Sequence, residues 1–162
     1  RAIRADKLTY AALSVTLLHY LKGEAEREIP IWRMVSATPD AIRTRAQGWA
    51  NRLPAELVLS GDHTGSHAEV TGEVIVIPGE STIGGGSLPG ETLPTFLLAL
   101  NVRSPKRFLA RLRAATPPVI ARAQDKRVLL DPRTVLEEQD ESLIEVLRQN
   151  FHIKNPNVRN PL

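Results

Sequence analysis

The order of strands and helices is set by residues 96–130, which read FLLALNVRSPKRFLARLRAATPPVIARAQDKRVLL. The run opens with an apolar segment that ends at Val102 and is typical of a buried strand. Ser104-Pro105 then combines a capping residue with a proline at the first helical position, and Pro117-Pro118 ends that segment. Two short apolar runs flank Gln124-Asp125-Lys126, which is the pattern of a hairpin. The stretch therefore predicts a strand, a helix and a hairpin in that order.

Two helices are predicted before this stretch. An apolar stripe at helical spacing predicts the first helix over residues 6–22, and Gly23 follows as a stop. Thr38-Pro39 repeats the cap-and-proline signature and predicts a second helix that runs to Leu53. Between them, residues 29–32 are expected to form a connector or a short extended piece, because Pro30 disfavours helix upstream.

Further elements complete the predicted domain. Short strands are expected at residues 57–59 and 74–77, separated by a polar loop at 60–72. A final helix is expected over residues 136–151, and the tail after it is expected to be flexible. We therefore expect a two-layer α/β sandwich with helices on one face of a small, mostly antiparallel sheet. The predicted core consists of Val15, Leu18, Trp49, Val76, Leu98, Phe108, Ile120, Leu129 and Leu147.

Length and composition limit the possible classes of protein. A chain of 162 residues with 42% hydrophobic and 24% charged residues is long and apolar enough for one folded domain. No cysteine is present, which removes disulfides, thiolate metal sites and thiol nucleophiles. No apolar run approaches the roughly 20 residues that cross a bilayer, so no membrane association is expected. The cations are sixteen arginines and five lysines, which suits binding of phosphate or carboxylate but also fits a GC-rich genome.

Several motifs have both a chemical and a purely structural interpretation. Residues 79–90 include three consecutive glycines, which suit either an anion cradle or a flexible loop. His63 and His67 lie four residues apart, but Gly65 argues against the helix that would join them at a metal, so no metal site is predicted. The third helix contains basic residues that suit RNA phosphates or a solvated face; they are Lys106, Arg107, Arg111 and Arg113. From composition and spacing alone, the sequence predicts a soluble α/β domain with candidate anion sites and nothing more specific.

Five blocks, taken in order, resemble one known family. The blocks are residues 1–9 (RAIRADKLT), 27–30 (REIP), 84–90 (GGGSLPG), 117–122 (PPVIAR) and 129–135 (LLDPRTV). The chain resembles the C-terminal third of the bacterial L-seryl-tRNA(Sec) selenium transferases, or selenocysteine synthases, from Arg1 to about Leu147. The departures from the family pattern are Ala121, Pro132, the 60–72 loop and the tail.

The resemblance implies a fold, a reaction and partners. It implies the small C-terminal domain of an aminotransferase-like (type I) pyridoxal-phosphate enzyme, with residues 1–23 as the linking helix, 24–151 as the small domain and 152–162 as a flexible tail. The implied enzyme converts seryl-tRNA(Sec) to selenocysteinyl-tRNA(Sec) with selenophosphate, is cytoplasmic, and is a homo-oligomer through its large domain. The lysine that forms the Schiff base with pyridoxal 5'-phosphate is implied to precede Arg1, so this chain alone is expected to be inactive and not to bind the cofactor covalently.

The resemblance also implies site residues. Arg1 and Arg4 match the family arginines that hold the anionic selenium donor, which agrees with the ability of guanidinium groups to bind anions. Arg122 and Arg133 match blocks that lie near the substrate carboxylate in related enzymes. Ser87 lies in the glycine block, without an assigned role.

Two other functions remain open at this stage. One is a pyridoxal-phosphate ammonia lyase or eliminase of the same superfamily that acts on a small sugar acid or amino acid. The other is a module without enzyme activity that binds RNA or takes part in assembly. The length of the intact protein, an upstream lysine and a tRNA-binding extension would separate these alternatives.

Overall fold

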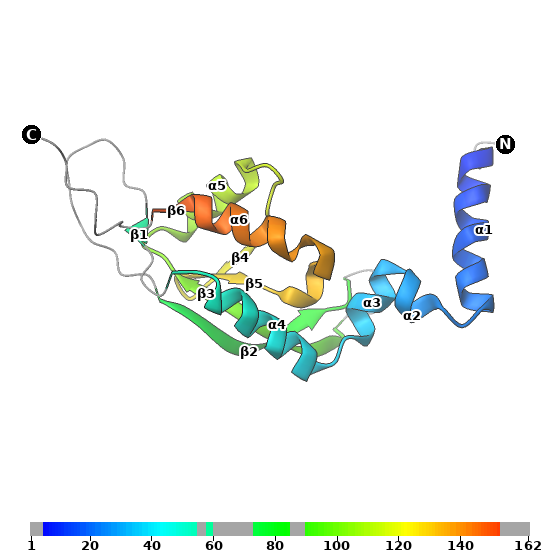
Figure 1. The fold of residues 1–162 in the computed structure, drawn as a ribbon, viewed down its shortest axis with the longest axis horizontal. Coiled ribbons are helices and arrows are strands. Elements are labelled where there is room, and N and C mark those ends of the chain that lie inside the picture. The colour runs from blue at the N-terminus through cyan, green and yellow to red at the C-terminus, as the bar shows by residue number, and fades with distance from the viewer. Residues whose placement is uncertain (1–4, 55–57, 60–72, 85–89, 153–162) are drawn as a thin grey trace, which may run out of the picture. The chain divides into compact units, whose positions relative to one another are not determined.

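The chain forms two compact units that divide between Thr38 and Pro39. A computed structural model describes residues 5–54, 58–59, 73–84 and 90–152. The first unit contains α1 (Lys7–Leu21), α2 (Ala25–Glu28) and α3 (Pro30–Ser36). The second unit contains the sheet, and its parts are labelled in Figure 1.

The start of α1 follows from its cap. The Asp6 carboxylate accepts a hydrogen bond from the Thr9 backbone N–H at 2.7 Å, and this bond lowers the pKa of Asp6. The prediction of a helix over 6–22 is therefore confirmed. The connector predicted at 29–32 is wrong, because only Ile29 is extended and Pro30 is the first residue of α3. Proline fits this position because the first helical N–H needs no partner within the helix.

Helix α1 displays apolar side chains on all sides. None of its residues is buried within the described part of the chain, and Leu8 and Leu21 are 81% and 83% exposed. Val15 and Leu18, which the sequence assigned to the core, are about half exposed, so that prediction is wrong for both. Across the described ranges, no helix has both the length and the apolar character needed to span a membrane.

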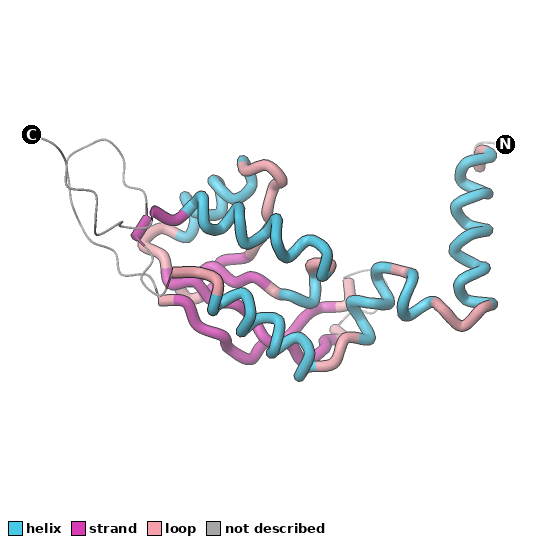
Figure 2. The backbone as a smooth tube through the Cα atoms, in the orientation of Figure 1, coloured by secondary structure: helices cyan, strands magenta, loops and turns pink. Residues whose placement is uncertain are grey.

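The second unit is built on a four-stranded antiparallel sheet in the order β2-β3-β5-β4. Its strands are β2 (Val74–Thr82), β3 (Thr92–Asn101), β4 (Arg122–Gln124) and β5 (Arg127–Leu130). Figure 2 shows β2 and β3 as long neighbouring strands, and their register pairs Val74 with Leu100 and Thr82 with Thr92. A separate antiparallel pair joins β1 (Val58–Leu59) to β6 (Phe151–His152).

Helices cover one face of this sheet. They are α4 (Pro39–Asn51), α5 (Pro105–Ala114) and α6 (Asp140–Asn150), with 3-10 turns η1 (Pro132–Thr134) and η2 (Glu137–Gln139) before α6. The main core includes Trp49 of α4, Leu98 of β3, Phe108 of α5 and Ile144 of α6. Because alternate residues of a strand point to opposite faces, Leu98 and Leu100 face the helices. The prediction of an α+β domain with helices on one face of an antiparallel sheet is confirmed.

Strands β2 and β4 differ in extent from the sequence prediction. Strand β2 does not end at Ile77 but continues through Pro78 and Gly79 to Thr82, so the first part of the predicted 79–90 loop is strand. Proline is tolerated there because β2 lies at the edge of the sheet. Ile120 is 76% exposed and does not belong to the core, because β4 begins only at Arg122.

The hairpin between β4 and β5 is confirmed. Asp125 and Lys126 have φ of 50° and 63°, so both turn residues adopt the left-handed conformation that two-residue hairpin turns require. The last helix is also confirmed, with Leu143, Ile144 and Leu147 buried, but it begins at Asp140 after the two 3-10 turns and ends at Asn150. Residues 151–152, predicted as the helix end and the start of the tail, instead form β6.

Candidate functional site

The face of the sheet opposite the helices, here called the open face, contains a cavity of about 400 Å³. Its apolar floor includes Ile77 and Leu97, which belong to a cluster that contains only strand residues. The hairpin contributes Arg122, Gln124 and Arg127 to the wall. Arg122 lies opposite Leu129 in the register, and strand alternation places both on the open face.

Arg122 joins the two edges of the sheet across this cavity. Its Nη2 donates a hydrogen bond to the Glu80 carbonyl oxygen at 3.4 Å, although β4 and β2 are the outermost strands. Its side chain is otherwise exposed, so further guanidinium N–H groups face the cavity or solvent. Two arginines at one wall suit a carboxylate or a phosphate, while Glu80 and Asp125 give the cavity a mixed charge.

A hydrogen-bonded hub lies further along the same face, centred on Asp131. Its carboxylate accepts hydrogen bonds from the Ser81 hydroxyl, from the Thr95 hydroxyl at 2.9 Å and from the Arg133 backbone N–H at 3.0 Å. Ser81 and Thr95 are both buried. The hub therefore ties β2 and β3 to the turn that follows β5.

Arg133 extends from η1 into the interior. It is 5% exposed, and its Nη2 donates to the Pro94 carbonyl oxygen at 2.8 Å. Burial lowers the pKa of the guanidinium from its ordinary value, and the Asp131 carboxylate offsets part of this effect. Arginine nevertheless stays charged in proteins, so Arg133 provides a fixed positive charge beneath the end of the sheet.

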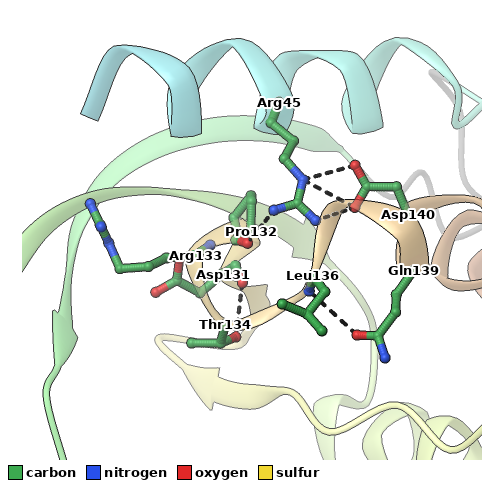
Figure 3. Close-up of polar contacts among 8 residues, drawn as sticks. All are labelled: Arg45, Asp131, Pro132, Arg133, Thr134, Leu136, Gln139 and Asp140. Carbon is green, nitrogen blue, oxygen red and sulfur yellow. Dashed lines mark hydrogen bonds and ion pairs between the residues drawn. The ribbon is translucent and has the colours of Figure 1, made fainter. Parts of the chain in front are cut away.

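A second arginine holds η1 in place. Figure 3 shows Arg45 reaching from α4 to the carboxylate of Asp140 at the start of α6. Its Nε lies 2.8 Å from Asp140 Oδ2, and its Nη1 donates to the Pro132 carbonyl oxygen at 2.8 Å. The turn is closed by the Thr134 hydroxyl, which donates to the Asp131 carbonyl oxygen at 2.9 Å. Arg45 thus fixes the turn that carries both Asp131 and Arg133.

Gly84 and Gly90 are the described ends of the glycine block, which lies between β2 and β3 along the chain. Gly84 and Gly90 have φ of 85° and 84°, a backbone conformation that residues with a side chain rarely adopt. The Ile83 backbone N–H donates to the Glu91 carbonyl oxygen at 3.3 Å, which extends the pairing of the two strands by one step. Glycine is therefore required for the backbone conformation at both ends of the connection.

Three of the five blocks that resemble the family meet at the second half of β2. The hairpin block reaches Glu80 through Arg122, the LLDPRTV block reaches Ser81 through Asp131, and the glycine block directly follows. Arg1, Arg4 and Ser87 lie outside the described residues, as do His63, His67 and the predicted 153–162 portion of the tail. The predicted substrate contacts of Arg122 and Arg133 stay predictions.

Sequence reasoning missed the roles of Thr95, Asp131 and Arg45. The sequence does mark Thr95, because it is a polar residue in an apolar strand and strand alternation places it on the same face as Leu97 and Ala99. Asp131 had a weaker signal, as an aspartate directly before a proline after a strand. Within the described ranges, no three acidic or histidine side chains gather into a group that could hold a metal ion.

Comparisons with known proteins agree on one family. The family model described as SelA, L-seryl-tRNA selenium transferase, matches residues 1–136. The L-seryl-tRNA(Sec) selenium transferase of Solidesulfovibrio magneticus is 40% identical over 154 residues, which cover 92% of this chain and 30% of that protein. The proteins of the same name from Geobacter sulfurreducens and Carboxydothermus hydrogenoformans are 39% and 33% identical, over 92% and 86% of this chain.

The match covers the open face, the hub and the glycine block together. The chain spans about 30% of the length of these relatives. A family match over residues 1–136, and identities of 33–40% across most of the chain, mean that this chain belongs to the L-seryl-tRNA selenium transferase family.

Proposed function

We propose that this chain is the C-terminal part of a pyridoxal-phosphate-dependent enzyme that converts seryl-tRNA(Sec) to selenocysteinyl-tRNA(Sec) with selenophosphate. The observation that carries the proposal is the family match over residues 1–136. The names of the similar proteins support it, because they specify selenium transfer to seryl-tRNA(Sec). No specific observation favours the lyase or the module without enzyme activity. The structure contributes a second support, because three family blocks converge on one end of β2.

The exposed apolar surface of α1 supports a place for this chain within a larger protein. A helix that is apolar on all sides is typical of one enclosed by protein, and α1 has no buried residue among those described. In this proposal residues 1–23 link the small domain to an aminotransferase-like large domain. The large domain also forms the homo-oligomer, and the enzyme is cytoplasmic.

The described residues do not by themselves fit the cofactor. The described lysines are all exposed, and none of them lines the cavity; they are Lys7, Lys22, Lys106 and Lys126. As the family resemblance implies, the lysine that binds pyridoxal phosphate is proposed to lie upstream of Arg1, and no step through the cofactor is derived from this chain. The residues of this chain bind and orient charged groups: Arg1 and Arg4 the anionic selenium donor, and Arg122 a carboxylate or phosphate at the open face.

Activity of the full-length protein tests the proposed function directly. The protein is mixed with seryl-tRNA(Sec) and selenophosphate, and selenocysteinyl-tRNA is quantified after hydrolysis of the ester. We expect conversion that depends on both substrates. Deamination of a free amino acid or sugar acid, with no product on the tRNA, would instead identify a lyase.

Replacement of Arg4 by alanine in the full-length enzyme is expected to lower turnover with selenophosphate by about tenfold to hundredfold. A charge-assisted hydrogen bond to the donor in a partly desolvated cleft is worth about 1.5 to 3 kcal/mol. The matched control is Lys126→Gln, which removes one exposed positive charge from the hairpin turn. Steady-state kinetics at low and high salt should show an Arg4→Ala defect that persists, because screening mainly weakens exposed charges. Equal, salt-sensitive losses of turnover in both variants would show that Arg4 does not bind the selenium donor.

The isolated 162-residue chain is expected to form no covalent adduct with pyridoxal phosphate. The chain is incubated with the cofactor, reduced with borohydride and weighed by intact mass spectrometry, and the reduced full-length enzyme serves as the positive control. A stoichiometric, site-specific adduct on the isolated chain would place the cofactor lysine within these residues.

A further inference from the structure

The strongest unexplained feature of the second unit is a segment of uniform charge. Residues 92–124 contain six basic residues in total, five arginines and one lysine, and no aspartate or glutamate. Since the whole chain has a net charge of +3 and this segment contributes +6, the rest of the chain has a net charge of −3. The positive charge is therefore concentrated around α5, which this segment contains.

Helix α5 separates its apolar and charged residues cleanly. It buries Phe108, Leu109 and Leu112 in the core. At 100° per residue, Arg107 lies on the side opposite the buried residues, whereas Lys106 and Arg113 lie together on one flank of the helix. All three are exposed, as is Arg103 just before the helix. We call these four cations the basic face of α5. Lys106 and Arg113 are about 10 Å apart along the helix axis, from the rise of 1.5 Å per residue.

Three of the four cations of the basic face have no acidic partner within the part of the chain that the structure describes. Among the described residues, no ion pair joins Arg103, Lys106 or Arg113 to an acidic side chain. Arg111 is tied to the protein instead, because it donates to the Asn150 carbonyl oxygen at 3.1 Å and lies over the ring of Phe108. Burial lowers the pKa of Arg111, and the like charge of Arg107 lowers it further, so the cations on this helix repel one another.

Helix stability does not account for this arrangement. Lys106 and Arg107 lie in the first turn of α5, which has no acidic residue and no side-chain cap from Ser104. Cations at this end of a helix face the positive end of its dipole, which disfavours them by about 0.3 to 1 kcal/mol each. The dipole therefore disfavours Lys106 and Arg107, whereas Arg113, in the last turn, lies at the end that favours cations. An anionic partner bound to this face would offset the cost of the two first-turn cations.

We propose that the basic face of α5 binds the sugar-phosphate backbone of double-helical RNA. The proposal rests on the proposed function, in which the substrate is attached to a tRNA. Helical RNA is recognised mostly through phosphate and 2′-hydroxyl contacts, whereas single-stranded RNA is recognised largely by stacking on aromatic side chains. The aromatic residue of α5, Phe108, is buried, so this face offers cations for phosphates and no ring for bases.

The test compares two triple variants of the full-length enzyme that lose equal charge. One variant carries Arg103→Gln, Lys106→Gln and Arg113→Gln on the basic face. The control carries Lys22→Gln, Arg43→Gln and Lys126→Gln, three exposed cations on other elements. The probes are uncharged tRNA(Sec), an RNA hairpin of unrelated sequence and vesicles containing phosphatidylserine. Thermal unfolding of both variants verifies that each is folded.

The basic-face variant is expected to bind both RNAs about tenfold or more weakly at low salt, whereas the control changes by less than about twofold. The slope of log K against log salt is expected to fall in magnitude by about 2 to 3, since each phosphate contact contributes roughly 0.7 to 0.9. Its KM for seryl-tRNA(Sec) is expected to rise while kcat stays near that of the wild type.

Two results would overturn the proposal. One is equal RNA affinity and equal salt slope for the two triple variants. The other is a loss of vesicle binding with RNA binding unchanged, which would assign the face to an anionic membrane surface. Failure of the proposed function is distinct, because it appears as an inability of the wild-type enzyme to convert seryl-tRNA(Sec), whatever the variants do.

Discussion

Leu98→Ala is expected to lower the free energy of unfolding of the second unit by about 3 to 5 kcal/mol. Leu98 is completely buried in β3, between Val76 of β2 and Leu130 of β5. Removal of a buried leucine side chain loses its transfer free energy and leaves a cavity that neighbouring strands close only in part. Urea unfolding followed by far-ultraviolet circular dichroism and tryptophan fluorescence measures the loss.

The matched control for Leu98 is Ile120→Ala. Both residues belong to the core predicted from the sequence, but Ile120 is 76% exposed, so its replacement is expected to change stability by less than about 0.5 kcal/mol. Losses of equal size in the two variants would show that the sheet is packed differently from the arrangement described above.

Asp131→Ala is expected to lower the free energy of unfolding by about 2 to 4 kcal/mol. The substitution removes the acceptor of the Ser81 and Thr95 hydroxyls and leaves both of these buried groups without it. It also removes the negative charge nearest to the buried guanidinium of Arg133. A buried donor that loses its partner costs about 1 to 3 kcal/mol, and more beside a charged group. Denaturant unfolding of the same chain measures the effect.

A double-mutant cycle tests whether Ser81 and Asp131 act through one shared hydrogen bond. Ser81→Ala and Asp131→Ala should be strongly non-additive, with a coupling energy of about 0.5 to 3 kcal/mol, because they remove opposite ends of one hydrogen bond. Asp125→Asn is the charge control, since asparagine tolerates the left-handed conformation of this exposed turn residue. Additive effects of the two alanine substitutions would contradict a shared hub.

Local signals predicted most of the fold. Proline at the first helical position marks α4 and α5, and the Asp125-Lys126 turn marks the hairpin. The same proline signal is present at Pro30, which begins α3, but proline also disfavours helix in the residue before it, and the sequence does not show which effect prevails. The predicted strand at 74–77 is shorter than β2, because its apolar run stops at Pro78 and the sequence does not reveal that this strand lies at an edge, where proline is tolerated.

The candidate site was harder to predict from the sequence than the fold, because it depends on how strands far apart in the chain pair in the sheet. The resemblance identified the blocks that contain Arg122 and Asp131, but only the folded sheet brings them to adjacent residues of β2. Burial of Arg133 is also a tertiary effect, since no local pattern in the sequence distinguishes it from the exposed Arg122. Arg1 and Arg4 rest on resemblance alone.

The clamp of Arg45 on Asp140 has a consequence for protein synthesis. These residues are 95 positions apart, and a second link, from Arg148 to the Arg52 carbonyl oxygen at 2.8 Å, spans 96. The first helix of this unit emerges from the ribosome long before its partner, α6, is made. Closure of such a long loop is slow, and unfinished sheets expose apolar surface. The nascent chain therefore completes this unit only after α6 has left the exit tunnel, and until then the apolar residues of its sheet lack their partners on α6.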